Sequence, residues 1–354
     1  MRLIAIICIF LLSLGAVIAQ EPAHEDSPDM GIFAAKAYRP AWAPVPMLQG
    51  DASKTVILQK LLASEDSRTR ARSAFLLGQI GSPDSVKPLS DLLNDSDRDV
   101  RIQAGIALAC LGDARGITAC ATALKESPTW IKLYAVHGLW RTNSPRAMDV
   151  LKKSAVTDKG FISRTIKAAL KTKYIVPPTA PLPEGDVPPV VASDQLWLET
   201  SDLFAEESDW WWHQGNYEQV IRCRETALFL DPTFVENYGL IAWLQWSMGH
   251  DAEAIRTLQR GISAVPTDPS VYFELGFHYF NTKRYVQAER YLRKAVDLGG
   301  DHLVRRMYAH CLEKLGRLDD ALAVWKGLVE SRPDDGTAKS NMERVQGLLD
   351  DKNR

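Results

Sequence analysis

Apolar residues recur every three or four positions in short segments between residues 51 and 172, and polar loops separate these segments. This spacing places apolar side chains on one face of a helix, so each segment predicts an amphipathic α-helix. The segments form pairs with a period of 31 residues: Gly81 and Gly112 share one position, and Leu77 and Leu108 share another. Because one helix pair cannot bury its own apolar face, the period predicts a stacked array, an α-solenoid.

A second period, of 34 residues, runs through residues 194–334, where Gly215 and Gly249 share one position. It predicts four further helix pairs, each with a turn between its helices. Residues 335–354 continue with an apolar spacing that predicts a capping helix and a short tail. The sequence therefore predicts an all-α fold that consists of two α-solenoids.

Short motifs in both arrays resemble known repeat families. The pattern D-x-x-V-R at Asp97–Arg101 precedes an alanine-rich helix and a Leu-Gly-Asp turn, which resembles the short HEAT-like repeats of bilin lyases. The 34-residue pattern resembles the tetratricopeptide repeat, and its signature positions include Leu275, Gly276, Tyr279, Ala288, Ala295, Pro232 and Pro266. The resemblances imply a HEAT-like domain over residues 51–172 and a four-repeat tetratricopeptide domain over residues 194–334.

Two proline-containing segments flank the first array. Residues 173–193 hold six prolines between Pro177 and Pro189, and proline resists helix, so a semi-rigid linker is expected to separate the two domains. Residues 20–50 are first acidic and then alternate proline with apolar residues, which predicts an extended or disordered tail.

The first 19 residues have the pattern of a signal peptide. Arg2 supplies the positive charge, Ile4 begins the apolar run, and Val17-Ile18-Ala19 offers small residues for cleavage. We expect cleavage after Ala19 and export to the periplasm or cell envelope, in the style of exported bacterial repeat proteins. A retained membrane anchor is the alternative, since the apolar run is near the lower length limit for a span. No later run is long enough to cross a membrane.

Export makes cysteine usage informative. Cys110, Cys120, Cys223 and Cys311 are sparse and have no C-x-x-C spacing, so we expect buried, unpaired thiols. A disulfide between Cys110 and Cys120 across a helical hairpin is the alternative. The net charge of −2 supplies no basic field for nucleic acid, and we expect no nucleic-acid partner.

Three consecutive tryptophans, Trp210, Trp211 and Trp212, cannot all face one core. We expect Trp211 in the core beside Tyr279, Trp212 in a groove, and Trp210 against an adjoining helix or partly exposed. The tetratricopeptide resemblance implies that the first helix of each repeat lines a concave groove that binds peptides. In register, the aromatic residues expected to line this groove are Trp212, Trp243, Trp246, Phe273, Phe277 and Phe280.

Two alternatives remain for these rings. In this family such rings also support neighbouring helices, so their role can be structural. The linker or the tail around Trp42 can also fill the groove. At the far end of the groove, Arg305 and Arg306 are candidates to bind one carboxylate, with His310 nearby.

Signatures of catalysis are absent from the sequence. It contains no phosphate-binding loop, no nucleophile elbow and no H-E-x-x-H, and its seven histidines have no zinc spacing, so we expect no metal and no cofactor. The predicted function is a non-enzymatic exported scaffold or adaptor that binds a protein or peptide partner through the aromatic groove. The alternatives are a HEAT-like lyase or its accessory subunit, with Cys110 or Cys120 as its reactive group, and an envelope glycan-binding module.

Overall fold

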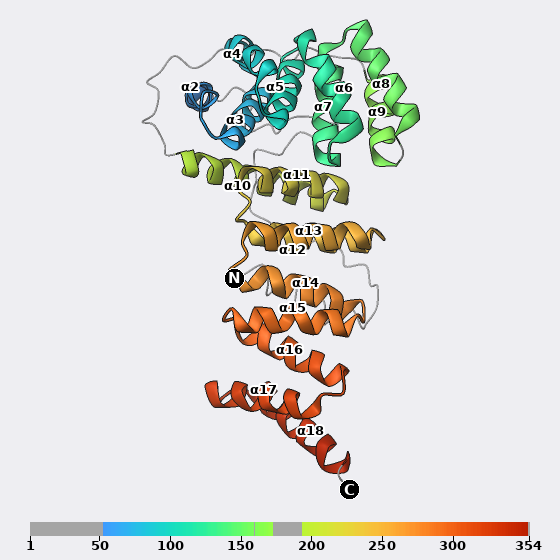
Figure 1. Cartoon of the computed structure of the whole chain (residues 1–354). Helices are drawn as coiled ribbons and strands as arrows, with labels where there is room; N and C mark the ends of the chain where they lie inside the picture. The colour runs from blue at the N-terminus through green and yellow to red at the C-terminus, as the bar shows by residue number, and fades with distance from the viewer. Residues whose placement is uncertain (1–51, 159, 173–192, 353–354) are drawn as a thin grey trace, which may run out of the picture. The chain divides into compact units, whose positions relative to one another are not determined.

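The computed structural model describes residues 52–158, 160–172 and 193–352, all of which lie in one compact unit, Pro40–Arg354. Within these ranges the chain forms α-helices and short 3₁₀ turns and no strand, as the sequence predicts (Figure 1). The expected signal peptide, tail and most of the linker fall outside the described residues.

The first array contains the helices up to Lys171. They are α2 (Ala52–Leu61), α3 (Ser67–Ile80), α4 (Val86–Asp91), α5 (Arg98–Cys110), α6 (Ile117–Glu126), α7 (Thr129–Thr142), α8 (Pro145–Thr157) and α9 (Phe161–Lys171). Helix α5 packs against α3 and α7, so the long first helices of successive units form the centre of this array. The 3₁₀ turns are η2 (Pro83–Ser85), η3 (Leu92–Asn94) and η4 (Ala114–Gly116).

The 31-residue period is visible in the helix caps. Asp66 begins α3 and Asp97 begins α5, and each carboxylate accepts hydrogen bonds from two backbone amides of the first turn. Gly81 then follows α3 with φ of 82°, a left-handed conformation that glycine adopts at no steric cost. Asn143 takes the same role after α7 with φ of 45°, so the predicted turns are confirmed.

Close packing of the first helices depends on small residues. A Cβ atom added at Gly78 of α3 would lie 2.7 Å from Cα of Ala107 in α5. At Gly138 of α7, an added Cβ would lie 2.8 Å from Cβ of Ala109. The backbones of α3, α5 and α7 therefore approach each other too closely for larger side chains at these positions.

The second array contains the remaining helices. They are α10 (Ser193–His213), α11 (Tyr217–Leu230), α12 (Val235–Ser247), α13 (Asp251–Ala264), α14 (Pro269–Asn281), α15 (Tyr285–Asp297), α16 (His302–Lys314), α17 (Leu318–Ser331) and α18 (Gly336–Lys352). Consecutive helices pack as pairs that follow one another along the chain (Figure 1). The first helices α12, α14 and α16 also contact one another, which places them on one side of this array.

The two arrays share a core where they meet. Leu196, Trp197 and Phe204 of α10, with Ala227 and Leu230 of α11, belong to the same buried cluster as the interior of the first array. The helix pairs that the sequence assigns to two arrays therefore share one buried interior among the described residues. Helix α10 is the longest helix described, and its N-terminal half packs on the first array.

Aromatic rings form the centre of this junction. The ring of Phe75 in α3 lies 6.0 Å from that of Phe204 and 5.8 Å from that of Phe229, and Trp130 lies 5.3 Å from Phe229. A hydrogen bond from Nε of Arg72 to the carbonyl of Phe229, 2.8 Å long, crosses the same boundary. Burial of several aromatic side chains makes this boundary comparable to a domain interior.

Candidate functional site

The three consecutive tryptophans differ in burial, and Trp211 occupies the core position expected of it. Trp211 is only 4% exposed and its Nε1 donates a hydrogen bond of 2.8 Å to Oε1 of Glu207. Trp210 is half-buried and packs its ring edge against Trp211, with centroids 4.6 Å apart. Trp212 points outward and is 36% exposed.

The expected contact between Trp211 and Tyr279 is wrong. Trp211 packs with Val220 of its own repeat and Leu244 of the next first helix. Tyr279 lies one repeat further along and stacks on Tyr291, with ring centroids 5.7 Å apart. A buried ring in this array therefore contacts the adjacent repeat rather than the one beyond it.

The six groove candidates occupy the first helices α10, α12 and α14, and we refer to them as the aromatic surface: Trp212, Trp243, Trp246, Phe273, Phe277 and Phe280. Trp212 of α10 and the half-buried Trp243 of α12 have ring centroids 6.0 Å apart and planes inclined by 30°. This pair links two neighbouring repeats. Tyr217, which the sequence reasoning left out of the site, packs edge-on against Trp212 at 5.4 Å and is itself exposed.

The other rings of the aromatic surface are more deeply packed. Phe273 is 7% exposed and stacks on Phe277 with centroids 5.7 Å apart. Phe280 packs against Tyr285 at 5.4 Å, in the same edge-on geometry as Trp212 and Tyr217 two repeats earlier. Trp246 packs at 6.2 Å from the ring of His278. The rings thus rest on three separate core clusters, and the open end of the surface is at Trp212.

A pair of carboxylates lies beside the aromatic surface. A Cβ atom added at Gly239 of α12 would lie 2.8 Å from Oε2 of Glu274, so this carboxylate of α14 packs directly against the glycine backbone. Burial, and then the negative charge of Glu236, raise the pKa of Glu274 to about 7. Among the described residues, neither Glu236 nor Glu274 forms a hydrogen bond or an ion pair through its side chain.

The sequence reasoning missed this pair, although it carries one signal. Gly239 stands 34 residues before Phe273, in the same column of the repeat. The absence of a side chain at Gly239 leaves the space that the carboxylate of Glu274 fills.

The two arginines at the far end differ in their surroundings. The guanidinium of Arg306 pairs with the carboxylate of Asp335, a pairing that holds the pKa of Asp335 below its usual value. Arg305 is exposed and its side chain has no ion pair among the described residues. His310 packs against Trp325, with ring centroids 5.0 Å apart. The charge of Arg306 is therefore already paired with Asp335, and not with a partner's carboxylate.

A cavity of about 990 Å³ lies at the junction of the arrays and is bordered by α7, α9, α11 and α13. Trp130, Phe161 and Met248 contribute apolar surface to its wall. Its charged groups are largely paired with one another, since Lys132 lies 3.1 Å from Asp158 and Arg260 lies 2.6 Å from Glu225.

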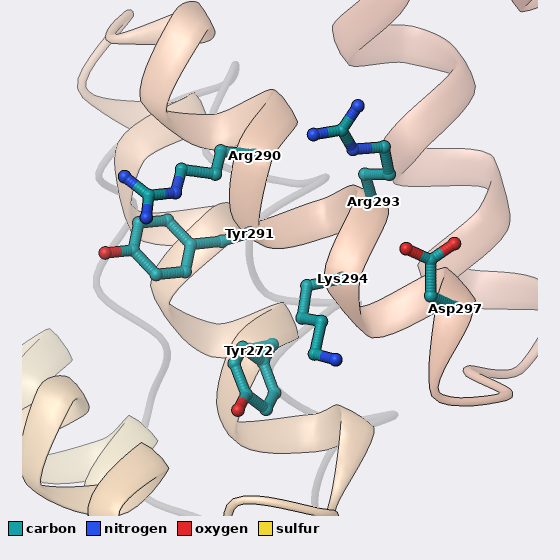
Figure 2. A pocket seen from close by; sticks show the side chains of 6 residues that line it. All are labelled: Tyr272, Arg290, Tyr291, Arg293, Lys294 and Asp297. Atoms are coloured by element: carbon teal, nitrogen blue, oxygen red, sulfur yellow. The ribbon is translucent and has the colours of Figure 1, made fainter.

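A smaller cavity of about 340 Å³ lies between α14 and α15 (Figure 2). Tyr272 lines it from α14, and the other lining residues come from α15: Arg290, Tyr291, Arg293, Lys294 and Asp297. Figure 2 shows these charged side chains spread around the rim without converging on one point. None of the six residues of the aromatic surface lines this cavity.

The four cysteines among the described residues are buried and form no disulfide, so the alternative bond between Cys110 and Cys120 is not formed in this structure. Burial raises the pKa of the Cys110 thiol to about 12 and that of Cys120 well above its usual value. A nucleophilic cysteine requires its thiolate, and these environments disfavour it. The lyase alternative therefore lacks an activated thiol at the two residues on which it depends.

Two further findings concern the described residues as a group. No three or more His, Cys, Asp or Glu side chains gather there in a way that would hold a metal ion. None of the helices described has both the length and the apolar content to cross a bilayer.

Comparisons with known families agree with the helix pattern. A family model for HEAT repeats matches residues 55–131, and one for the tetratricopeptide repeat matches residues 279–343. The chain contains both HEAT repeats and tetratricopeptide repeats. The second match begins at Tyr279 and so includes only Phe280 of the aromatic surface.

One curated relative matches part of the chain. BBSome complex member BBS4 of Bos taurus is 25% identical over 121 residues, which span 34% of this chain and 23% of that protein. The match thus covers about a quarter of that relative's length.

Solved structures with similar coordinates include the MamA protein, with 20% identity, coverage of 43% of this chain and 86% of that one, and a TM-score of 0.36. YrrB, described as a TPR protein with an unusual peptide-binding site, has 19% identity, coverage of 45% and 86%, and a TM-score of 0.35. A thermophilic TPR protein of Thermus thermophilus has 14% identity, coverage of 64% and 98%, and a TM-score of 0.35.

Proposed function

We propose that this protein is an exported, non-enzymatic scaffold that binds an extended peptide segment of a protein partner through the aromatic surface. Tetratricopeptide repeats are of a type used as protein-interaction scaffolds, because stacked helix pairs present long surfaces with independent side-chain choices. The observation that carries the proposal is the pair of Trp212 and Trp243. Trp212 remains 36% exposed while it packs on a half-buried ring of the adjacent repeat.

Such a pair has the properties of an interface anchor. Tryptophan and tyrosine dominate binding energies because they bury large areas and lose few rotamers. Tyr217 extends the exposed aromatic area next to Trp212. Trp243 packs against the cluster of Trp211 and its buried neighbours, so one ring of the pair is held in place before any partner binds.

The non-enzymatic part of the proposal is supported by the absence of catalytic motifs in the sequence and by the burial of Cys110 and Cys120. The glycan-binding alternative needs polar side chains grouped around the rings to fix hydroxyl groups. The carboxylates of Glu236 and Glu274, which lie on the same helices as Trp243 and Phe277, accept hydrogen bonds but do not donate them when ionised.

The binding site can be tested with peptides selected from a random displayed library on the full chain. We expect a Trp212→Ala/Trp243→Ala variant to bind the selected peptides at least about thirtyfold more weakly, because hot-spot truncations cost about 2 kcal/mol or more. Val286→Ala, which trims an exposed apolar residue of α15, is the matched control and should bind normally. Far-UV circular dichroism should be the same for all three proteins. Equal binding by the double variant would refute the site.

Export is tested by expression in a bacterial host followed by intact-mass analysis. The expected product begins at Gln20 and is released from the periplasm. A product that begins at Met1 and stays with the membrane fraction would support the retained anchor instead.

A further inference from the structure

We propose that the partner segment carries an arginine that binds the carboxylates of Glu236 and Glu274, with apolar residues beside it on the aromatic surface. This inference rests on the proposed function and adds the chemistry of the partner to it. It is carried by the position of the two carboxylates, by their lack of partners among the described residues, and by the rings that adjoin them.

The position follows from helical spacing and one close contact. On α12, Glu236 precedes Gly239 by three residues and Trp243 follows it by four, so these residues share one face of the helix. On α14, Glu274 precedes Phe277 by three residues and shares its face. The carboxylate of Glu274 rests against Gly239, which joins the two faces into one.

Several buried or half-buried carboxylates of the second array have cationic partners within the chain, and others, such as Asp268, accept a backbone hydrogen bond. Glu225 pairs with Arg260, Glu313 with Arg344, and Asp335 with Arg306. Glu274 is half-buried as well and differs from them, because the structure gives its side chain no hydrogen bond or ion pair among the described residues. The charge that acts on the ionisation of Glu274 is the carboxylate of Glu236, which repels it.

A cation between these groups would remove the repulsion. Arginine fits better than lysine, because its planar guanidinium presents several N–H donors that can bind two carboxylates together. The same guanidinium is attracted by the faces of aromatic rings, such as Phe277, one turn from Glu274, and Trp243, one turn from Gly239. An acidic segment is excluded by the same charges, so the surface discriminates as well as binds.

The experiment uses a random displayed peptide library and three forms of the full chain: the natural sequence, Glu236→Gln/Glu274→Gln, and Trp212→Ala/Trp243→Ala. On the natural sequence, we expect selected peptides to be enriched in an arginine flanked by apolar residues. One selected peptide is then synthesised in two versions, with arginine and with the neutral, isosteric citrulline. Citrulline should weaken binding to the natural chain about tenfold, in the range measured for close charge pairs. It should have no effect on Glu236→Gln/Glu274→Gln.

The outcomes separate the two proposals. Peptides that need Trp212 and Trp243 but show no arginine enrichment would overturn the inference and leave the proposed function in place. A citrulline penalty that persists in Glu236→Gln/Glu274→Gln would also overturn it, because the cation would then bind elsewhere. Peptides that bind Trp212→Ala/Trp243→Ala undiminished would overturn the proposed function, and the inference with it. The glutamines preserve side-chain shape, so the variants are expected to fold.

Discussion

Substitution of Glu274 by glutamine should stabilise the protein at alkaline pH and have little effect in acid. The pKa of Glu274 rises from 4.5 to about 7 on folding, because the carboxylate is buried and lies near Glu236. Between these values the folded state holds a proton more tightly than the unfolded state, so stability falls as pH rises through this window. Above pH 7 the full cost of an ionised Glu274 is present.

The magnitude follows from the size of the rise. A tenfold change in proton affinity corresponds to about 1.4 kcal/mol, so the rise predicts an upper limit of roughly 3 kcal/mol. Some solvent reaches this half-buried side chain, and we expect a gain of about 1–3 kcal/mol for Glu274→Gln at pH 8. Near pH 4.5 the gain should shrink to a few tenths of a kcal/mol, since Glu274 is then protonated in the folded protein.

The assay is urea unfolding of the full chain, followed by tryptophan fluorescence at several values between pH 5 and pH 8. Glu330→Gln is the control, because Glu330 is an exposed carboxylate of α17 without an ion pair among the described residues. Its effect should be small and should not change across this range. A Glu274→Gln variant that is no more stable than the natural protein at pH 8, or whose gain does not vary with pH, would refute the reasoning.

Three further experiments test the packing of the core. Phe204→Ala should cost about 3–5 kcal/mol and split unfolding into two transitions, because this ring joins the cores of both arrays; coincident fluorescence and circular dichroism transitions would contradict it. Cys110 and Cys120 should react with Ellman's reagent only when the protein unfolds, since burial keeps both thiols protonated; rapid labelling of the native chain would count against the burial. Gly78→Ala should destabilise by about 1–3 kcal/mol because its Cβ meets the α5 backbone, whereas Gly327→Ala in α17, where nothing lies within 4 Å, should stabilise by up to about 1 kcal/mol; thermal denaturation compares them.

Local features of the fold were predictable from sequence. Helix periods, capping residues and left-handed turns depend on neighbours within a few positions, as at Asp97 and Gly81, and repetition of the same unit amplified each signal. The core position of Trp211 followed from helical spacing alone. Such features need no knowledge of the tertiary structure.

Contacts between distant positions were not predictable in the same way. Phe75 and Phe204 meet across more than a hundred residues, and each also fits the apolar pattern of its own helix, so neither marks the junction. In the sequence Glu274 is an ordinary polar position, and only the structure shows that its carboxylate packs against Gly239. The pairing of Arg306 with Asp335 likewise joins α16 to the start of the capping helix α18. In each case the role of a residue depends on a contact with a residue far away in the sequence, which local patterns do not show.

The long helix α10 determines where this chain can be cut and rejoined. The proline-rich stretch before it is the obvious splice point for transplanting either array onto another protein, yet a cut there would strip Leu196 and Trp197 from the interior they complete. A break after α11 would keep this interior whole, because α10 and α11 would stay with the first array, but it would part Trp211 from Leu244 of α12. Trp210, Trp211 and Trp212, at the end of α10, would then remain with the first array.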